Sequence, residues 1–175
     1  AYYLADFKES CDEAMALYQR VLELNPNSEG ANNNIGHILE HHHQKYAEAI
    51  PFYQKAIDLL PSETRYYRNL SHALYKVGGD ENNARAKELL ETALEKDPTN
   101  GSNWKHWGDY HWNVASDLPA AKKAYLEGLK HEPKNALLLS NLAEVYFVHY
   151  KMYDIAFTVF KKSIEINASD YALAM

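Results

Sequence analysis

The sequence lacks the features that mark several common protein classes. Its 175 residues include one cysteine, so a disulfide framework is excluded and a reducing compartment, the cytoplasm, is expected. No apolar run approaches the roughly 18 residues of a membrane-spanning helix, and no signal peptide is visible. Lysine and arginine number 18 against 24 aspartates and glutamates, a net charge of −6. This charge has the wrong sign for following nucleic-acid phosphates, so we expect neither a nucleic acid nor a membrane as partner.

Motifs of catalysis are also missing. There are only 7 glycines, which form no phosphate-binding loop, and the pair Gly78–Gly79 is typical of a turn. No nucleophile elbow or paired-carboxylate motif is present. Cys11 has no evident activating partner. We therefore expect no enzyme activity and no cofactor in this segment.

What the sequence does contain is an internal repeat. A small residue recurs at intervals of 35, 37, 35 and 35 residues, at Ala14, Ala49, Ala86, Ala121 and Ala156. A bulky residue follows each alanine by four positions, at Tyr18, Tyr53, Leu90, Tyr125 and Phe160. Proline follows the first four alanines by twelve positions, and Ala168 takes that place in the fifth repeat. Self-similarity at such a period is typical of a solenoid.

Each repeat is predicted to be a pair of antiparallel helices. Upstream of each later alanine, apolar or small residues recur at helical spacing, as in Ile35, Gly36 and Leu39. Proline ends the second helix, and Ser28, Ser62 and Ser102 are the expected N-caps of the next first helix. The small residues Gly36, Ser71, Gly108 and Ala143 are expected to allow close contact with the repeated alanines. Around Gly78–Gly79–Asp80 we expect a longer loop.

These signals divide the chain into a single array. The expected boundaries are 1–27 for a partial first repeat, then 28–62, 63–99, 100–134, 135–168, and 169–175 for the start of a further helix. Because the chain starts and stops within expected helices, we interpret it as a segment of a longer protein with uncapped ends.

The recurring residues resemble the tetratricopeptide repeat family, whose pattern has Trp, Leu-Gly and Tyr on the first helix and Ala, Phe, Ala and Pro on the second. The repeat at 100–134 is the most similar, with Trp107-Gly108, Ala121, Tyr125 and Pro133. The resemblance covers about residues 1–168 and implies an all-α, right-handed superhelical solenoid of helix hairpins that binds proteins. The pentatricopeptide repeat has a similar period and binds RNA, but the proline and small-residue positions and the acidic charge favour the tetratricopeptide form.

In this family the first helices line a concave groove, so we predict the binding site there. The groove-facing positions include Glu40 and His41 of the second repeat and Asp109 and Trp112 of the fourth. Beside them, Asn34, Asn69 and Asn141 form a series, with His106 in the fourth repeat. Some family members hold peptide backbones through such asparagines, because an amide both donates and accepts hydrogen bonds. The alternative is that these amides satisfy neighbouring groups between stacked helices.

The middle of the predicted groove is basic. Arg65, Arg68, Lys76 and Lys105 lie there together with His72, which suggests an acidic or phosphorylated ligand segment. A solvated face with interspersed ion pairs is the alternative. Trp112 shares the groove phase and is expected to anchor the ligand.

One histidine-rich segment could in principle bind metal. His37 and His41 are four residues apart, a spacing at which two imidazoles can ligate zinc, and His42 and His43 follow. Glu40 is the only close acid and no cysteine is near, so we expect no metal site.

The expected function is therefore a protein-interaction scaffold that binds an extended, acidic peptide segment in its groove. Two alternatives stay open. The chain could be a structural strut in a large assembly, with its convex face and uncapped ends making the contacts and allowing self-association. It could also be the substrate-recruiting arm of an enzyme whose catalytic domain lies outside this segment.

Overall fold

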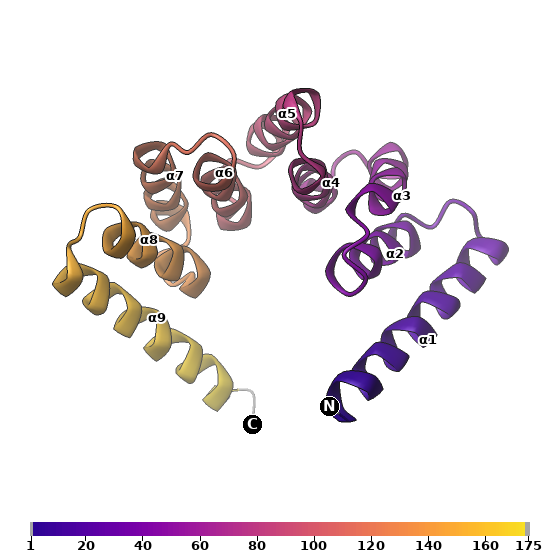
Figure 1. Ribbon diagram of the computed structural model, residues 1–175, viewed down its shortest axis with the longest axis horizontal. Coiled ribbons are helices and arrows are strands. Elements are labelled where there is room, and N and C mark those ends of the chain that lie inside the picture. The colour runs from indigo at the N-terminus through magenta and orange to yellow at the C-terminus, as the bar shows by residue number, and fades with distance from the viewer. Residues whose placement is uncertain (1, 174–175) are drawn as a thin grey trace. The chain divides into compact units, whose positions relative to one another are not determined.

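The computed structural model describes the backbone of residues 2–173 and the side chains of residues 10–168. Residues 2–173 form helices and no strand (Figure 1). In chain order they are α1 (Tyr2–Leu24), α2 (Glu29–His41), α3 (Tyr46–Leu59), α4 (Thr64–Val77), α5 (Asp80–Lys96), α6 (Gly101–Asn113), α7 (Leu118–His131), α8 (Ala136–Val148) and α9 (Tyr153–Leu173). The all-α prediction is confirmed. Between Tyr2 and Leu173, no helix is both long enough and apolar enough to cross a membrane.

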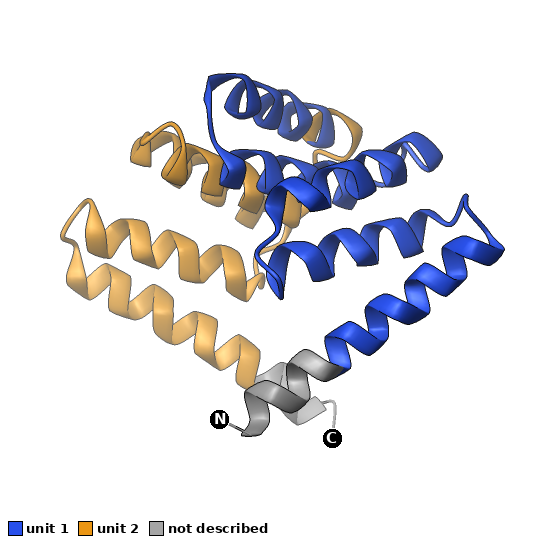
Figure 2. Ribbon diagram, turned by 45° about the vertical axis from the view of Figure 1, so that its right-hand side comes forward, with its two compact units in different colours: residues 1–93 blue, residues 94–175 orange. Residues whose placement is uncertain are grey.

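The helices pack against their neighbours in the chain, and they separate into two compact units, unit 1 over residues 1–93 and unit 2 over residues 94–175 (Figure 2). In unit 1, α2 packs on α1 and α3, and α3 packs on α4. In unit 2, α7 packs on α6 and α8, and α8 packs on α9. The helices α2, α4, α6 and α8 are called the first helices below.

Small residues let the two helices of a hairpin approach closely, as the sequence indicates. A Cβ atom on Gly36 would lie 2.8 Å from the Tyr53 ring of the partner helix, and one on Gly108 would overlap the Tyr125 ring. Both tyrosines are almost completely buried. In the α4/α5 pair, Ser71 instead donates its hydroxyl proton to the backbone oxygen of Ala86 at 2.9 Å. The glycines thus face the bulky residue four positions after the repeated alanine, while that alanine is itself buried.

One of the three expected N-caps is confirmed and two are wrong. The Ser28 hydroxyl caps α2 by accepting a hydrogen bond from the Ala31 amide at 3.3 Å. The cap of α4 is Glu63 and that of α6 is Asn100, one residue after Ser62 and two before Ser102. A carboxylate or amide oxygen can accept from a backbone N–H as a hydroxyl does, so neighbouring polar residues compete for the position.

The turns inside three hairpins share one conformation. Residues 42–45, 114–117 and 149–152 connect the helices, and each turn has a left-handed residue at the equivalent place, Gln44, Ser116 or Lys151. Each turn is closed by an equivalent backbone bond: Lys45 to Leu39, Asp117 to His111, and Met152 to Tyr146.

The expected longer loop around Gly78–Gly79–Asp80 is absent. Only Gly78 and Gly79 separate α4 from α5, and both have positive φ, at 80° and 91°. The extra residues of this repeat instead extend the second helix, since α5 has 17 residues where α3 and α7 have 14. Glycine tolerates this backbone because it has no Cβ atom.

The last helix passes the expected repeat boundary. Ala168 stands where the other repeats have proline, and α9 continues through it to Leu173. Alanine keeps the backbone N–H that a helix needs, so nothing at this position ends the ladder. Of the further helix expected over 169–175, residues 174–175 lie outside the described residues.

Candidate functional site

The basic side chains predicted for unit 1 lie along one helix. Arg65, Arg68, His72 and Lys76 of α4 follow one another at spacings of three, four and four residues, which places them on one face. Arg65 is more than half exposed and lies 3.5 Å from Glu63, and Arg68 donates to the Thr64 hydroxyl at 3.1 Å. The ammonium group of Lys76 lies 5.9 Å from the centre of the Tyr75 ring. Arg65 and Lys76 are exposed, and Arg68 is half-buried.

His72 has a second role, because it contacts a buried carboxylate on the neighbouring first helix. Glu40 of α2 is 1% exposed, so the prediction that it faces the groove is wrong. Its carboxylate pairs with the His72 ring and accepts a hydrogen bond from the Tyr53 hydroxyl at 2.6 Å. His41 lies 3.6 Å away. A carboxylate removed from water needs such partners, and here they join α2, α3 and α4.

Burial changes the titration of the groups around Glu40. It raises the pKa of Tyr53 far above its usual range, and the negative charge and hydrogen bond of Glu40 add to that shift. It lowers the pKa of His41, where the Glu40 charge partly opposes the effect. It also lowers the pKa of His37, whose ring centre lies 4.4 Å from that of His41. These two imidazoles therefore favour the neutral form.

The asparagine series of unit 1 is partly bonded within the protein. Asn69 of α4 donates to the side-chain oxygen of Asn33 on α2 at 2.8 Å, and Asn33 donates to Asn34 at 3.4 Å. Asn33 is buried, whereas Asn34 and Asn69 are half-buried. Asn69 therefore uses one end of its amide group to connect two first helices, whereas the bond of Asn34 lies within α2.

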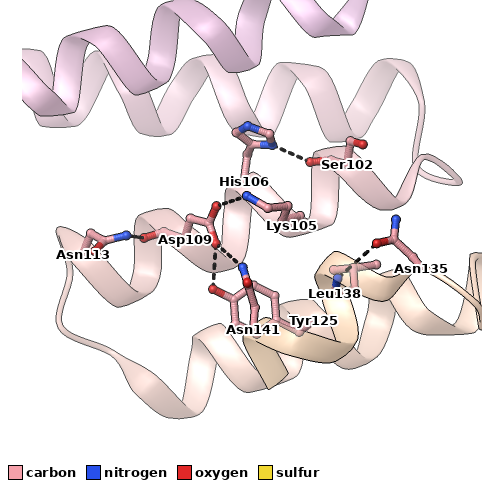
Figure 3. A network of polar contacts seen from close by, with 9 residues as sticks. All are labelled: Ser102, Lys105, His106, Asp109, Asn113, Tyr125, Asn135, Leu138 and Asn141. Atoms are coloured by element: carbon pink, nitrogen blue, oxygen red, sulfur yellow. Dashed lines mark hydrogen bonds and ion pairs between the residues drawn. The ribbon is translucent and has the colours of Figure 1, made fainter. Parts of the chain in front are cut away.

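Two predicted residues of unit 2, Lys105 and Asn141, contact Asp109 of α6 (Figure 3). Its carboxylate accepts three hydrogen bonds: from the Lys105 ammonium at 2.6 Å, the Tyr125 hydroxyl at 2.8 Å and the Asn141 amide at 2.8 Å. Burial raises the pKa of Tyr125 well above its usual range, and the charge of Asp109 raises it further. The tyrosine therefore keeps its proton. In this network Lys105 neutralises an internal carboxylate.

The other two predicted positions of unit 2 lie on the same helix. Trp112 is half-buried and packs against the apolar core of Ala121, Tyr125, Leu138, Leu142 and Val145. His106, in the asparagine position of its repeat, contacts the Ser102 backbone oxygen through Nδ1 at 2.8 Å.

The structure thus distributes the predicted site over both units. Asn34, Arg65, Arg68, Asn69, His72 and Lys76 belong to unit 1, and Lys105, Trp112 and Asn141 belong to unit 2. Among the described side chains, no group of three or more His, Cys, Asp or Glu residues is arranged to hold a metal ion.

Sequence reasoning missed that Glu40 and Asp109 organise the two networks. The sequence shows only that Tyr53 and Tyr125 occupy the same repeat position, and the structure is needed to show that each hydroxyl donates to an acid of its hairpin partner. The two acids stand at different repeat positions, one helical turn apart. Aligning the repeats therefore does not show that the two acids have the same role.

Comparison with known proteins supports the tetratricopeptide resemblance. The model of the family described as tetratricopeptide repeat matches residues 4–64. No curated protein sequence is significantly similar to the chain.

Three solved structures have the same fold over most of this chain. The crystal structure of TTC0263, a thermophilic tetratricopeptide repeat protein of Thermus thermophilus, has a TM-score of 0.77 at 20% identity, covering 94% of this chain and 87% of that one. A chain of the APC/C hetero-tetramer Cut9–Hcn1 has a TM-score of 0.77 at 20% identity, covering 91% of this chain and 31% of that one. YrrB, described as a tetratricopeptide repeat protein with an unusual peptide-binding site, has a TM-score of 0.57 at 21% identity, covering 94% and 81%.

These likenesses extend the fold well beyond the residues that the family model matches. The repeated hairpins, the buried alanines and the close glycine–tyrosine contacts recur outside residues 4–64 in the same positions. Residues 4–64 therefore match the tetratricopeptide repeat family model, and the chain as a whole shares the fold of solved tetratricopeptide repeat proteins.

Proposed function

We propose that this chain is a protein-interaction scaffold whose first helices bind an extended, acidic or phosphorylated segment of a partner protein. Tetratricopeptide repeat proteins are generally non-catalytic scaffolds, and similar structures include one with a peptide-binding site and one from a multiprotein assembly. The proposal is thus for a binding module without catalysis of its own. The lone cysteine, Cys11, supports a reducing location, the cytoplasm.

The observation that carries the proposal is the row of cations on α4. Arg65, Arg68 and Lys76 lie on one face of a single helix in a chain whose net charge is −6. Arginine forms paired hydrogen bonds with carboxylates and phosphates, and an extended acidic segment could contact all three cations. His72 is not counted as a ligand contact, because its ring pairs with Glu40. Its proposed role is to hold α4 against α2.

The amides beside this row could bind the peptide backbone. Asn69 uses its NH₂ group on Asn33, and Asn34 uses its oxygen to accept from Asn33. The oxygen of Asn69 and the NH₂ group of Asn34 accordingly form no hydrogen bond to the described residues. A peptide group supplies one donor and one acceptor, which matches these two free ends.

Fluorescence anisotropy with labelled twelve-residue peptides tests the proposal. One peptide carries four glutamates and a phosphoserine, and its control carries glutamines and serine at the same positions. We expect the acidic peptide to bind and the neutral one to bind at least about tenfold more weakly, with affinity falling as salt is added. Equal binding of the two peptides, or no binding of the acidic one, would contradict the proposed ligand chemistry.

A pair of charge-matched variants locates the site. Arg65→Gln/Lys76→Gln removes two exposed cations from the α4 row, and Lys55→Gln/Lys87→Gln removes two from α3 and α5 of the same unit. The affinity for the acidic peptide should fall by about tenfold in the first variant and by about twofold or less in the second. If both lose the same affinity, the binding reflects overall charge and the α4 row is not the site.

A second candidate, the structural strut, is favoured by apolar side chains on the first and last helices. Leu17 of α1 is 69% exposed, and Phe157 and Ile164 of α9 are 71% and 66% exposed. Contacts of these faces with other subunits, or with a second copy, would cover them. Light scattering on wild type and a Phe157→Ser/Ile164→Ser variant tests the self-association form. A monomeric wild type excludes that form.

A further inference from the structure

A small polar cavity in unit 2 has walls whose chemistry differs from that of the α4 row. It has a volume of about 150 Å³ and is lined by Asp109, Trp112, Asn113, Tyr125, Asn141 and Glu144. Cavities that hold drug-sized ligands are typically about 300–1,000 Å³, whereas one of about 150 Å³ can hold a benzene-sized group. The size therefore fits the end of one side chain.

Three hydrogen-bond donors in these walls are used within the protein. The Tyr125 hydroxyl and the Asn141 NH₂ group both donate to the Asp109 carboxylate at 2.8 Å (Figure 3). The Asn113 NH₂ group donates to the Asp109 backbone oxygen at 2.8 Å. Carboxylate and backbone oxygens can only accept, so these bonds fix which end of each amide is bound.

Three acceptor groups in these walls remain available. The side-chain oxygens of Asn113 and Asn141 form no hydrogen bond to the described residues, and the Glu144 carboxylate has no ion-pair or hydrogen-bond partner among them. Glu144 is also exposed, so a ligand can reach it. A ligand that supplies hydrogen-bond donors can therefore bind these oxygens.

The charge around the cavity favours a cationic donor. Lys105 lies 2.6 Å from Asp109 and neutralises it. Glu144 has no such partner, which leaves one uncompensated negative charge among the lining residues. Trp112 adds an aromatic ring, and a cation held near an indole ring gains further attraction.

We propose that this cavity binds the basic end of an arginine or lysine side chain of the partner segment. A guanidinium or ammonium group would donate to the free oxygens of Asn113 and Asn141 and pair with Glu144. The inference deepens the proposed function and rests on it only in that the first helices bind a peptide. The site lies within unit 2, and the α4 row lies within unit 1.

NMR titration with blocked amino acids tests the inference. The probes are Nα-acetyl-arginine amide, Nα-acetyl-lysine amide and the uncharged isostere Nα-acetyl-citrulline amide, and the signal is the indole N–H of Trp112, assigned with Trp112→Phe. We expect saturable shifts with arginine or lysine and an affinity for citrulline that is lower by about fivefold or more. Equal affinities for arginine and citrulline, or no saturable shift with either cation, would overturn the inference.

Matched variants place the binding at the cavity. Glu144→Gln should weaken binding of the cation by about fivefold, while Glu165→Gln, which removes another exposed carboxylate of unit 2, should leave it unchanged. Both substitutions are at the surface, so the spectra of both variants should remain those of the folded protein. Equal effects of the two would show general charge attraction only and overturn the inference. The acidic-peptide assay on the α4 row is independent, so either proposal can fail alone.

Discussion

At the scale of single residues, Gly108 permits the tight contact inside the α6/α7 hairpin. A methyl group at this position would overlap the Tyr125 ring, which is buried and held by its hydrogen bond to Asp109. Gly108→Ala should therefore destabilise the protein by about 1–3 kcal/mol. Gly30→Ala is the control, because a methyl group there has no neighbour within 4 Å. It should be neutral or stabilising by up to about 1 kcal/mol. Urea unfolding of both variants checks this, and an equal loss in both would refute the steric explanation.

A second residue-scale prediction concerns acid. Burial holds the pKa of His37 and His41 below the usual 6.5, so at mildly acidic pH the unfolded chain binds more protons than the folded one. Stability is accordingly expected to fall as pH drops through about 6.5. The His37→Gln/His41→Gln variant should lose part of this dependence. Melting temperatures between pH 7.5 and 5.5 measure it, and parallel curves for variant and wild type would contradict the prediction.

The residue positions that the sequence predicted well are those fixed by the repeat. Ala49, Ala86, Ala121 and Ala156 are buried as expected, because backbone packing leaves one geometry for that position. The partners of long polar side chains were not predictable in this way. Asn69 reaches Asn33 and Asn141 reaches Asp109, at sequence separations of 36 and 32, which differ by a helical turn. Side-chain rotation, which the repeat does not specify, decides between such partners.

At the scale of helices, the N-caps of α2 and α4 can be tested, because the structure confirms one cap predicted from the sequence and replaces the other. The Ser28 hydroxyl accepts from the Ala31 amide, whereas α4 is capped by Glu63, next to Ser62. Ser28→Ala should cost about 1 kcal/mol and Ser62→Ala close to nothing. Chemical denaturation of the two single variants measures the difference. The reverse order would mean that Ser62 caps α4 in solution.

Element boundaries were predictable where proline marks them. The second helices α3 and α7 each end two residues before a proline, Pro61 and Pro133, as expected. The turn at Gly78–Gly79 was not predictable, because two glycines are compatible with a loop of any length. In the structure, Gly78 and Gly79 have positive φ angles and form a two-residue connection. The additional residues of this repeat lie in α5.

At the scale of the whole molecule, unit 1 and unit 2 each have an apolar core of their own. In a repeat protein, stability is approximately the sum of local terms from each repeat and its neighbours. Gly108→Ala should accordingly accelerate hydrogen exchange in α6, α7 and α8 more than in α2 and α3. Exchange followed by mass spectrometry resolves these helices. An equal acceleration throughout residues 2–173 would show that the two units unfold as one.

The fold class was predictable at this scale because five repeats each indicate the same helix hairpin. A misleading residue in one repeat therefore does not change the prediction. The ligand was less predictable. The sequence places Lys105 in a basic centre, but its ammonium group pairs with Asp109, and Glu40 is inside the protein. Charged residues on a helix face indicate a binding surface only if they do not pair with other charged residues of the same protein. Such ion pairs can be identified only from the structure.

The shared turn conformation makes three of the hairpins exchangeable. The pairs α2/α3, α6/α7 and α8/α9 are each joined by four residues with a left-handed third residue and the same closing hydrogen bond. The connection inside each of these hairpins is therefore the same wherever the hairpin stands in the chain. One of these hairpins could replace another and introduce its own surface residues without any change in the turn between the two helices. The α4/α5 pair is the exception, because two glycines join its helices in place of the four-residue turn, and the helix that carries the basic row belongs to this pair.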